Sequence, residues 1–213
     1  FEMRVLEIGA ADGSLTRRAL EMLERMRRGE SFKPKSPDEK LALCLALEFK
    51  RLGEPKRISV MDTHLPGFEG LVYAEKEELL EKLKENLEDR FDRLFHFYYV
   101  PSLFRKPGMV EKRKWSYDPR RFWEEIERKG LKFDYVYGSR VLNPIMRQLL
   151  ETLKEEKELG VLPFLSLFED FYRISKKGFF FIEPALNMGP FIQISILFSD
   201  KARKEFEKWF KKV

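Results

Sequence analysis

The residues of this chain whose types and spacing could bind a ligand lie near its start, in Val5–Leu15. An apolar strand pattern, Val5–Ile8, runs into a turn of small residues, and a helix pattern follows. Gly9 permits a tight turn, and Ala11 and Gly13 let a ligand approach the backbone closely. The N-terminus of the following helix offers N–H donors and a partial positive charge. The segment therefore predicts a cofactor-binding turn.

Glu7 narrows the choice of cofactor. It interrupts an apolar strand, where a carboxylate is costly to bury unless it is paired or hydrogen-bonded. A positively charged amino-acid group on the ligand, or backbone donors of the turn, would provide that pairing. A dinucleotide site needs Gly-x-Gly-x-x-Gly, and counting from Gly9 this chain has Ala11 and Ser14 at the second and third glycines. An oxidoreductase with a nucleotide cofactor is therefore the disfavoured alternative.

The same segment resembles the first motif of class I S-adenosylmethionine-dependent methyltransferases, in which an acid and one further residue precede Gly-x-Gly-x-Gly. In this chain the motif consists of Glu7, Gly9, Ala11 and Gly13, with alanine for the middle glycine. Two later segments, Phe133–Ser139 and Arg173–Pro184, are similar to the fourth strand of that family and to the approach to its fifth strand. The resemblance spans roughly residues 4–198 in order.

The resemblance implies that the chain binds S-adenosyl-L-methionine and transfers its methyl group to an acceptor that the sequence does not identify. It implies that Asp62, which ends the second predicted strand, binds the ribose hydroxyls. It places Thr63, Ser102 and Ser139 near the adenine and the substrate. His64 is the candidate catalytic residue, because it follows Asp62 in the loop at the cofactor end and could contact adenine or substrate; a solvated loop histidine is the alternative. The residues implied to hold the amino-acid end of the cofactor are Glu7, Gly9, Ala10, Ala11 and Gly13.

The chain departs from the family pattern in three ways. Asp62 lies 53 residues after Gly9, whereas about 20 is usual in such units, so we expect a helical insertion at residues 30–56. The helix and strand that normally follow the fifth strand are missing, and almost nothing precedes the first strand. Phe1 is compatible with a chain that begins inside a longer protein. These departures support an alternative function, a non-catalytic cofactor- or partner-binding module.

The remaining pattern predicts a single α/β domain, residues 1–213, with a doubly wound, mostly parallel sheet of about six strands and helices on both faces. Residues 184–190 are too few for a parallel crossover, so the last strand should form an antiparallel hairpin with the fifth. Ser36–Glu39 has the form of a capping box that opens a helix. The strands are expected at Val5–Ile8, Arg57–Asp62, Leu94–Val100, Phe133–Tyr137, Gly178–Glu183 and Phe191–Phe198. The helices are expected at Ser14–Arg28, Pro37–Leu52, Glu75–Arg90, Asp118–Lys129, Asn143–Ser175 and Lys201–Lys211.

The positive net charge of the chain is compatible with an acidic or nucleic-acid partner. The net charge is +5, and a basic loop at residues 101–118 follows the third predicted strand. Across residues 105–121 several basic side chains are interleaved with aromatic ones, a combination that suits RNA, whose phosphates and bases they would contact. The loop could instead be a lid over the substrate or a plain solvated loop. Charged residues make up 36% of the chain, and this mixture of both signs is also typical of proteins from high-temperature organisms.

The sequence excludes some other classes of protein and gives no indication of a metal site. No apolar run is long enough to span a bilayer, so no membrane association is expected and the cytoplasm is the default compartment. The single cysteine, Cys44, excludes a disulfide framework and is expected to be a buried structural thiol. His96 lies within a predicted strand and is expected to be a structural residue. No spacing of histidine, cysteine and carboxylate residues indicates a metal.

Overall fold

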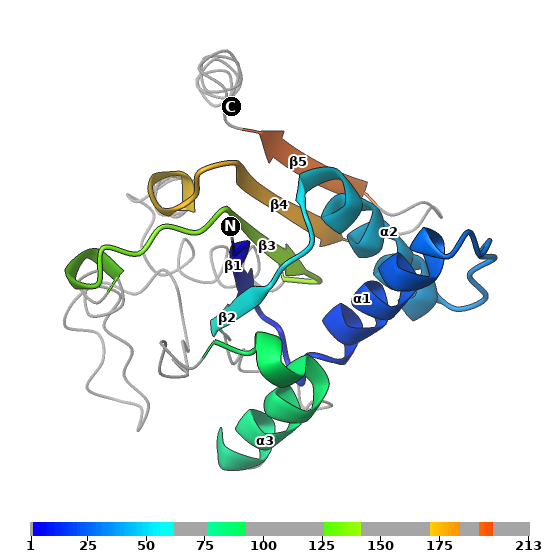
Figure 1. The fold of residues 1–213 in the computed structure, drawn as a ribbon, viewed down its shortest axis with the longest axis horizontal. Helices are drawn as coiled ribbons and strands as arrows, with labels where there is room; N and C mark the ends of the chain where they lie inside the picture. The colour runs from blue at the N-terminus through cyan, green and yellow to red at the C-terminus, as the bar shows by residue number, and fades with distance from the viewer. Residues whose placement is uncertain (1, 62–75, 93–125, 142–170, 184–191, 198–213) are drawn as a thin grey trace, which may run out of the picture.

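The structure is a computed structural model, and it describes residues 2–61, 76–92, 126–141, 171–183 and 192–197. A five-stranded sheet organises these residues, and helices cover it (Figure 1). Short helical stretches at residues 126–128 and 171–174 precede the third and fourth strands. The elements are β1 (Arg4–Ile8), α1 (Ser14–Arg27), α2 (Pro37–Leu52), β2 (Arg57–Met61), α3 (Lys76–Leu87), the 3₁₀ turn η1 (Glu88–Arg90), β3 (Tyr135–Ser139), β4 (Gly178–Glu183) and β5 (Ile192–Leu197).

The sheet has the strand order β2-β1-β3-β4-β5. β1 pairs in parallel with β2 on one side and with β3 on the other, and β3 pairs in parallel with β4. β5 runs antiparallel to β4, with Phe181 opposite Ile194. The α/β class, the parallel sheet and the antiparallel last strand are therefore confirmed. The chain goes from β1 to one neighbour and then returns to the other, so the strand order reverses between β1 and β3.

The strand boundaries differ from the sequence-based ones mainly at β3, which was expected at Phe133–Tyr137. The ladder with β1 starts at the pair Val5 and Tyr135. Phe133 forms only an isolated bridge with Ser175, and the backbone of Asp134 donates to the carbonyl of Arg4 at 2.6 Å. These residues lie just before the regular ladder because β1 begins at Arg4, so β3 is shifted two residues along the chain.

Several predicted elements lie wholly or partly outside the described residues. The predicted strand Leu94–Val100 and the predicted helix Lys201–Lys211 are outside altogether, as is most of the predicted helices after Asp118 and Asn143. The chain that leads toward Leu94 is described, and Phe91 makes a parallel bridge with Ile58 of β2. Asp92 donates its backbone N–H to the carbonyl of Ile58 at 2.9 Å. The segment before that predicted strand therefore runs along the outer edge of β2.

The two faces of the sheet are covered by different segments. On one face, alternate residues of the strands form a core with the buried faces of α1, α2 and α3, including Leu23, Leu45 and Leu83. On the other face, Phe171 packs against Phe179 and Phe181 of β4, with ring centroids 5.8 and 6.0 Å away. Successive side chains of β1, β3 and β4 point to opposite faces and are buried on both, which allows a layer to form on each face.

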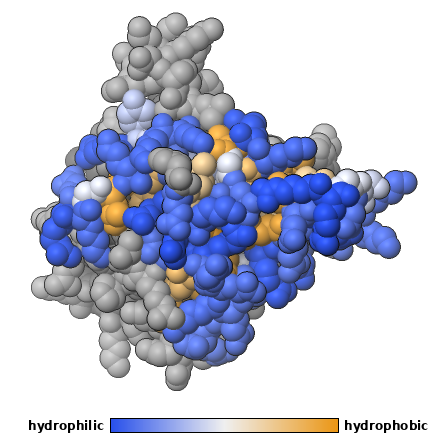
Figure 2. Space-filling view, viewed as in Figure 1, coloured by the Kyte–Doolittle hydropathy of each residue, from blue (hydrophilic) through white to orange (hydrophobic). Residues whose placement is uncertain are grey.

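The helix α2 lies between α1 and β2 in the chain, and it packs against α1. Its predicted capping box is confirmed: Ser36 accepts from the backbone of Glu39, and Glu39 accepts from the backbone of Ser36. Hydrophilic residues cover most of the described surface on the face shown in Figure 2, with small apolar areas between them. Within the described ranges, none of the helices has the length and apolar character that a membrane crossing requires.

Candidate functional site

The reversal of strand order fixes where a ligand site is expected. In open α/β sheets, ligands bind outside the carboxyl ends of the strands, at the point where the strand order reverses. Here that point lies between the ends of β1 and β3, where Ile8 is paired with Gly138. Gly9 and Ser139 are the next residues along the two strands. The predicted cofactor turn and the predicted Ser139 are therefore brought to the same edge of the sheet.

The turn from β1 into α1 has a left-handed backbone at three of its residues. The φ angles are 68° at Gly9, 50° at Ala11 and 78° at Gly13. Ala11 is a non-glycine residue in this region, a conformation that costs about 1–2 kcal/mol. The turn is closed by a hydrogen bond of 2.9 Å from the N–H of Gly13 to the carbonyl of Ala10. The segment is thus a tight, strained turn that leads directly into the first turn of α1.

An acidic side chain occupies part of the helix N-terminus. Asp12 Oδ1 accepts a hydrogen bond of 3.0 Å from the backbone N–H of Ser14. The carbonyl of Asp12 accepts from the side-chain amide of Asn86 on α3 at 2.7 Å. A carboxylate at this position repels a second anion, so the N-terminus of α1 is less suited to a pyrophosphate than to a neutral or cationic ligand group.

Gly9 and Gly13 of the turn also have close neighbours within the protein. A Cβ atom at Gly9 would lie 2.8 Å from Cγ2 of Val141, which follows β3. A Cβ atom at Gly13 would lie 3.2 Å from carbon atoms of both Leu83 and Leu87 on α3. The packing inside the protein therefore opposes a side chain at Gly9 and leaves little room for one at Gly13, and the backbone angles favour glycine at both.

Glu7 lies in the core beneath the turn, with a relative exposure of 3%. Its Oε1 accepts a hydrogen bond of 2.8 Å from the hydroxyl of Thr16 on α1. Its Oε2 accepts one of 2.8 Å from the hydroxyl of Tyr137 on β3. The structure thus gives Glu7 two hydroxyl donors, neither of which the sequence analysis considered. The carboxylate links β1, α1 and β3 directly below the candidate site.

Tyr137 is suited to this role as a donor. Its side chain is fully buried. Burial and, next, the charge of Glu7 raise the pKa of Tyr137 well above its ordinary value. The phenol therefore keeps its proton at neutral pH and donates a hydrogen bond to the carboxylate. Its ring stacks on Phe180 with the centroids 5.5 Å apart, which fixes the direction of the hydroxyl.

The loop after β3 forms the other side of the candidate site. Arg140 has a φ of 57° and pairs through its side chain with Asp38 in the first turn of α2. The backbone N–H of Val141 donates to Oε1 of Glu183, at the end of β4, over 2.7 Å. Ser139 has a buried hydroxyl oxygen, and this oxygen has no hydrogen-bond partner among the described residues. A buried hydroxyl of this kind is a group that a ligand could satisfy.

Several predicted site residues lie outside the described residues. These are Asp62, Thr63, His64 and Ser102, together with His96 and the basic segment of residues 105–121. The ribose acid, the candidate base and the RNA-binding loop therefore remain predictions from the sequence. Of the predicted cofactor residues, the described ones at the reversal point are Glu7, Gly9, Ala10, Ala11, Gly13 and Ser139.

The single cysteine differs from its expectation. Cys44 on α2 is half-buried rather than fully buried. Burial and, next, the charge of Glu48 raise the pKa of the Cys44 thiol above its ordinary value. The thiol is therefore protonated at neutral pH, which does not suit a nucleophile. In the part of the chain that the structure describes, no group of three or more histidine, cysteine or acidic residues could hold a metal ion.

Comparisons with known proteins add no relative. A scan against protein-family models, a search of curated proteins and a search of solved structures each find no match to this chain.

Proposed function

We propose that the chain binds S-adenosyl-L-methionine at the carboxyl ends of β1 and β3 and transfers the methyl group to an acceptor. The observation that carries the proposal is the strained turn Gly9–Gly13, which joins β1 to α1 where the strand order reverses. The choice of S-adenosyl-L-methionine as the cofactor depends on the resemblance of Val5–Leu15 to the first methyltransferase motif. The doubly wound arrangement with about six strands, which the sequence predicts for this chain, is part of the same proposal.

The electrostatics of the turn favour this cofactor over a dinucleotide. Asp12 places a carboxylate on the N-terminus of α1. A pyrophosphate would meet that negative charge, whereas the sulfonium and ammonium groups of S-adenosylmethionine carry positive charge. The spacing of Gly9, Ala11 and Gly13 independently disfavours the dinucleotide pattern.

Ser139 provides a second support and a specific test. If its buried hydroxyl binds the cofactor, Ser139→Ala should weaken binding by about tenfold, since a hydrogen bond to a ligand in a buried site is lost. The same substitution should leave thermal stability unchanged, because the hydroxyl has no partner among the described residues. Thr16→Val is the matched control. This variant also removes a buried hydroxyl, but the hydroxyl of Thr16 donates a hydrogen bond to Glu7, so its loss should lower stability.

The experiment is a calorimetric titration of the purified chain with S-adenosylmethionine and S-adenosylhomocysteine, with NAD as the comparison ligand. We expect micromolar binding of the first two and none of NAD. Binding of NAD alone would replace the methyltransferase proposal with the oxidoreductase alternative.

A second function, a cofactor- or partner-binding module without turnover, is favoured by one observation. Val141, Leu83 and Leu87 already fill the space beside Gly9 and Gly13, so the glycines have a structural reason without a ligand. Methyl transfer to candidate acceptors separates the two functions. We test RNA first, because the basic segment of residues 105–121 suits it. Cofactor binding without transfer to RNA, protein or small-molecule acceptors would favour the module.

A further inference from the structure

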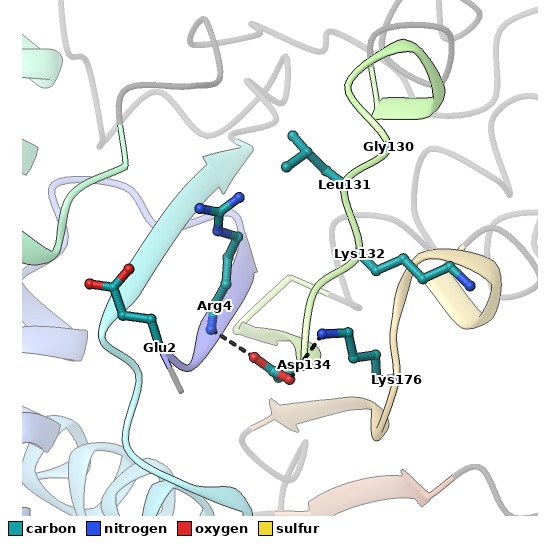
Figure 3. A pocket seen from close by; sticks show the side chains of 7 residues that line it. All are labelled: Glu2, Arg4, Gly130, Leu131, Lys132, Asp134 and Lys176. Carbon is teal, nitrogen blue, oxygen red and sulfur yellow. Dashed lines mark hydrogen bonds and ion pairs between the residues drawn. The ribbon is translucent and has the colours of Figure 1, made fainter.

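The opposite edge of the sheet carries a separate hollow. It has a volume of about 430 Å³ and lies at the amino ends of β1 and β3 (Figure 3). The proposed cofactor site lies at the carboxyl ends of the same strands, so the two sites are distinct. A volume of this size suits a small molecule. Its lining includes three cations, two acids and an apolar residue, namely Arg4, Lys132, Lys176, Glu2, Asp134 and Leu131.

The two acids of the hollow already have partners. Asp134 is 2% exposed, and its Oδ2 accepts a hydrogen bond of 2.8 Å from the backbone N–H of Arg4. Its Oδ1 lies 3.7 Å from Nζ of Lys176. Glu2 pairs with Arg57, 3.3 Å away, on the neighbouring strand β2. The charge of each acid is therefore partly neutralised before a ligand arrives.

Arg4 is ion-paired with the buried Asp92, but its guanidinium group makes no hydrogen bond among the described residues. Its Nε lies 3.6 Å from Oδ2 of Asp92, too far for a good hydrogen bond. Within the described residues, no hydrogen bond involves the guanidinium group, although the side chain is only 28% exposed. In Figure 3 the Arg4 side chain extends from β1 toward Leu131, and its terminal nitrogens point into the hollow. Lys132 also lines the hollow; it is exposed, and its side chain points away from Arg4 in Figure 3.

We propose that this hollow binds the oxyanion group of a small molecule, a phosphate or a carboxylate, with Arg4 as the central ligand. The planar guanidinium group donates two parallel hydrogen bonds to such a group, which gives both strength and direction. Lys132, whose side chain points away from Arg4 in Figure 3, adds only a more distant positive charge, and Leu131 offers an apolar contact to the rest of the molecule. This proposal is independent of the proposed cofactor, since the two sites share no residue.

The test uses the full ¹⁵N-labelled chain, titrated by NMR with inorganic phosphate and, separately, with succinate. We expect saturable shifts of the amide signals of Gly130, Leu131 and Lys132. Arg4→Gln should weaken binding by about tenfold or more, because it removes the bidentate charged donor. Lys132→Gln should weaken it by about threefold, since an exposed charge contributes less. This second variant keeps the test valid if Arg4→Gln fails to fold.

Arg17→Gln is the matched control. Arg17 lies on α1, is half exposed and pairs only weakly, with Glu21 at 3.6 Å. The variant has the same change in net charge but lies near the opposite edge of the sheet, so it should bind phosphate as the unmodified chain does. Saturable binding of either probe that Arg4→Gln or Lys132→Gln weakens supports the site, and the tighter probe identifies the ligand class. Absence of saturable shifts, or an equal loss in Arg17→Gln, would overturn the proposal.

Discussion

The hydroxyl of Tyr137 donates a hydrogen bond of 2.8 Å to the carboxylate of Glu7 on the neighbouring strand. This contact joins β1 and β3 where the strand order reverses, directly below the turn that we propose binds the cofactor. A buried carboxylate is tolerated in a core only when donors of this kind surround it. The pair therefore supports the geometry of the site from within the fold.

Removing that donor should destabilise the protein. We expect Tyr137→Phe to lower the free energy of unfolding by about 1.5–3 kcal/mol, because a buried charge loses a hydrogen bond. Tyr135→Phe is the matched control, since Tyr135 is also buried and donates to a neutral group, the carbonyl of Gly53, at 2.7 Å. Its loss should cost about 1 kcal/mol. Urea unfolding measures both, and an equal or smaller loss in Tyr137→Phe would contradict the role of Glu7 as a charged acceptor.

The turn residue Gly9 should tolerate no side chain. Gly9→Ala should cost about 2–4 kcal/mol, because it adds the strain of a left-handed backbone to the contact with Val141. Gly29→Ala separates the two contributions. Gly29 has a similar φ of 79°, but its Cβ would meet no atom within 4 Å. We expect that control to cost about 1 kcal/mol in thermal or urea unfolding. Similar losses in both variants would show that the Val141 contact is not tight.

Glu54 should make stability depend on pH in the acid range. It lies between three cations, with Arg27 at 2.5 Å, Arg90 at 2.7 Å and Lys56 at 3.2 Å. Burial alone would raise the pKa of Glu54, but the hydrogen bonds from Arg27 and Lys56 and the charge of Arg90 outweigh it, so this pKa is lowered. A carboxyl group whose pKa is lowered by folding binds protons more readily in the unfolded chain. Its contribution to the stability of the fold is therefore complete at a pH above its pKa in the unfolded chain. That contribution is lost as the pH falls through its pKa in the folded chain.

The lowered pKa of Glu54 leads to a testable difference in stability. At neutral pH, Glu54→Gln should be less stable than the unmodified chain. The difference in stability should shrink as the pH falls below about 4.3, the ordinary glutamate pKa. It should vanish once Glu54 is protonated in both the folded and the unfolded chain. Thermal unfolding between neutral and acid pH measures the difference. Lys84→Gln, which breaks only an exposed pair with Glu81, is the control and should leave the acid dependence unchanged. A constant difference across the pH range would contradict the lowered pKa.

Local signals predicted much of the fold from the sequence. The apolar run Val5–Ile8, the capping box at Ser36 and the short connection before the last strand each depend on neighbouring residues, and each is confirmed. The start of β3 was wrong by two residues because register with β1, a contact between distant segments, decides where the ladder begins.

The partners of Glu7 could not be predicted in the same way. Thr16 lies in the first turns of α1 and Tyr137 lies 130 residues away from Glu7. Only the fold brings both to one carboxylate. A weak signal existed, since Thr16 is a polar residue on the apolar face of a predicted helix. The hollow around Arg4 left no signal of its own, because its residues come from the starts of separate strands.

The most direct test of the central claim is calorimetric titration of the folded chain with S-adenosylhomocysteine, first unmodified and then as Ser139→Ala. The proposal predicts micromolar binding with one site, weakened by about tenfold in the variant while its unfolding temperature stays the same. No heat of binding at high ligand concentration, from a chain that circular dichroism shows to be folded, would contradict it. The turn at Gly9–Gly13 would then be a structural feature of the fold alone.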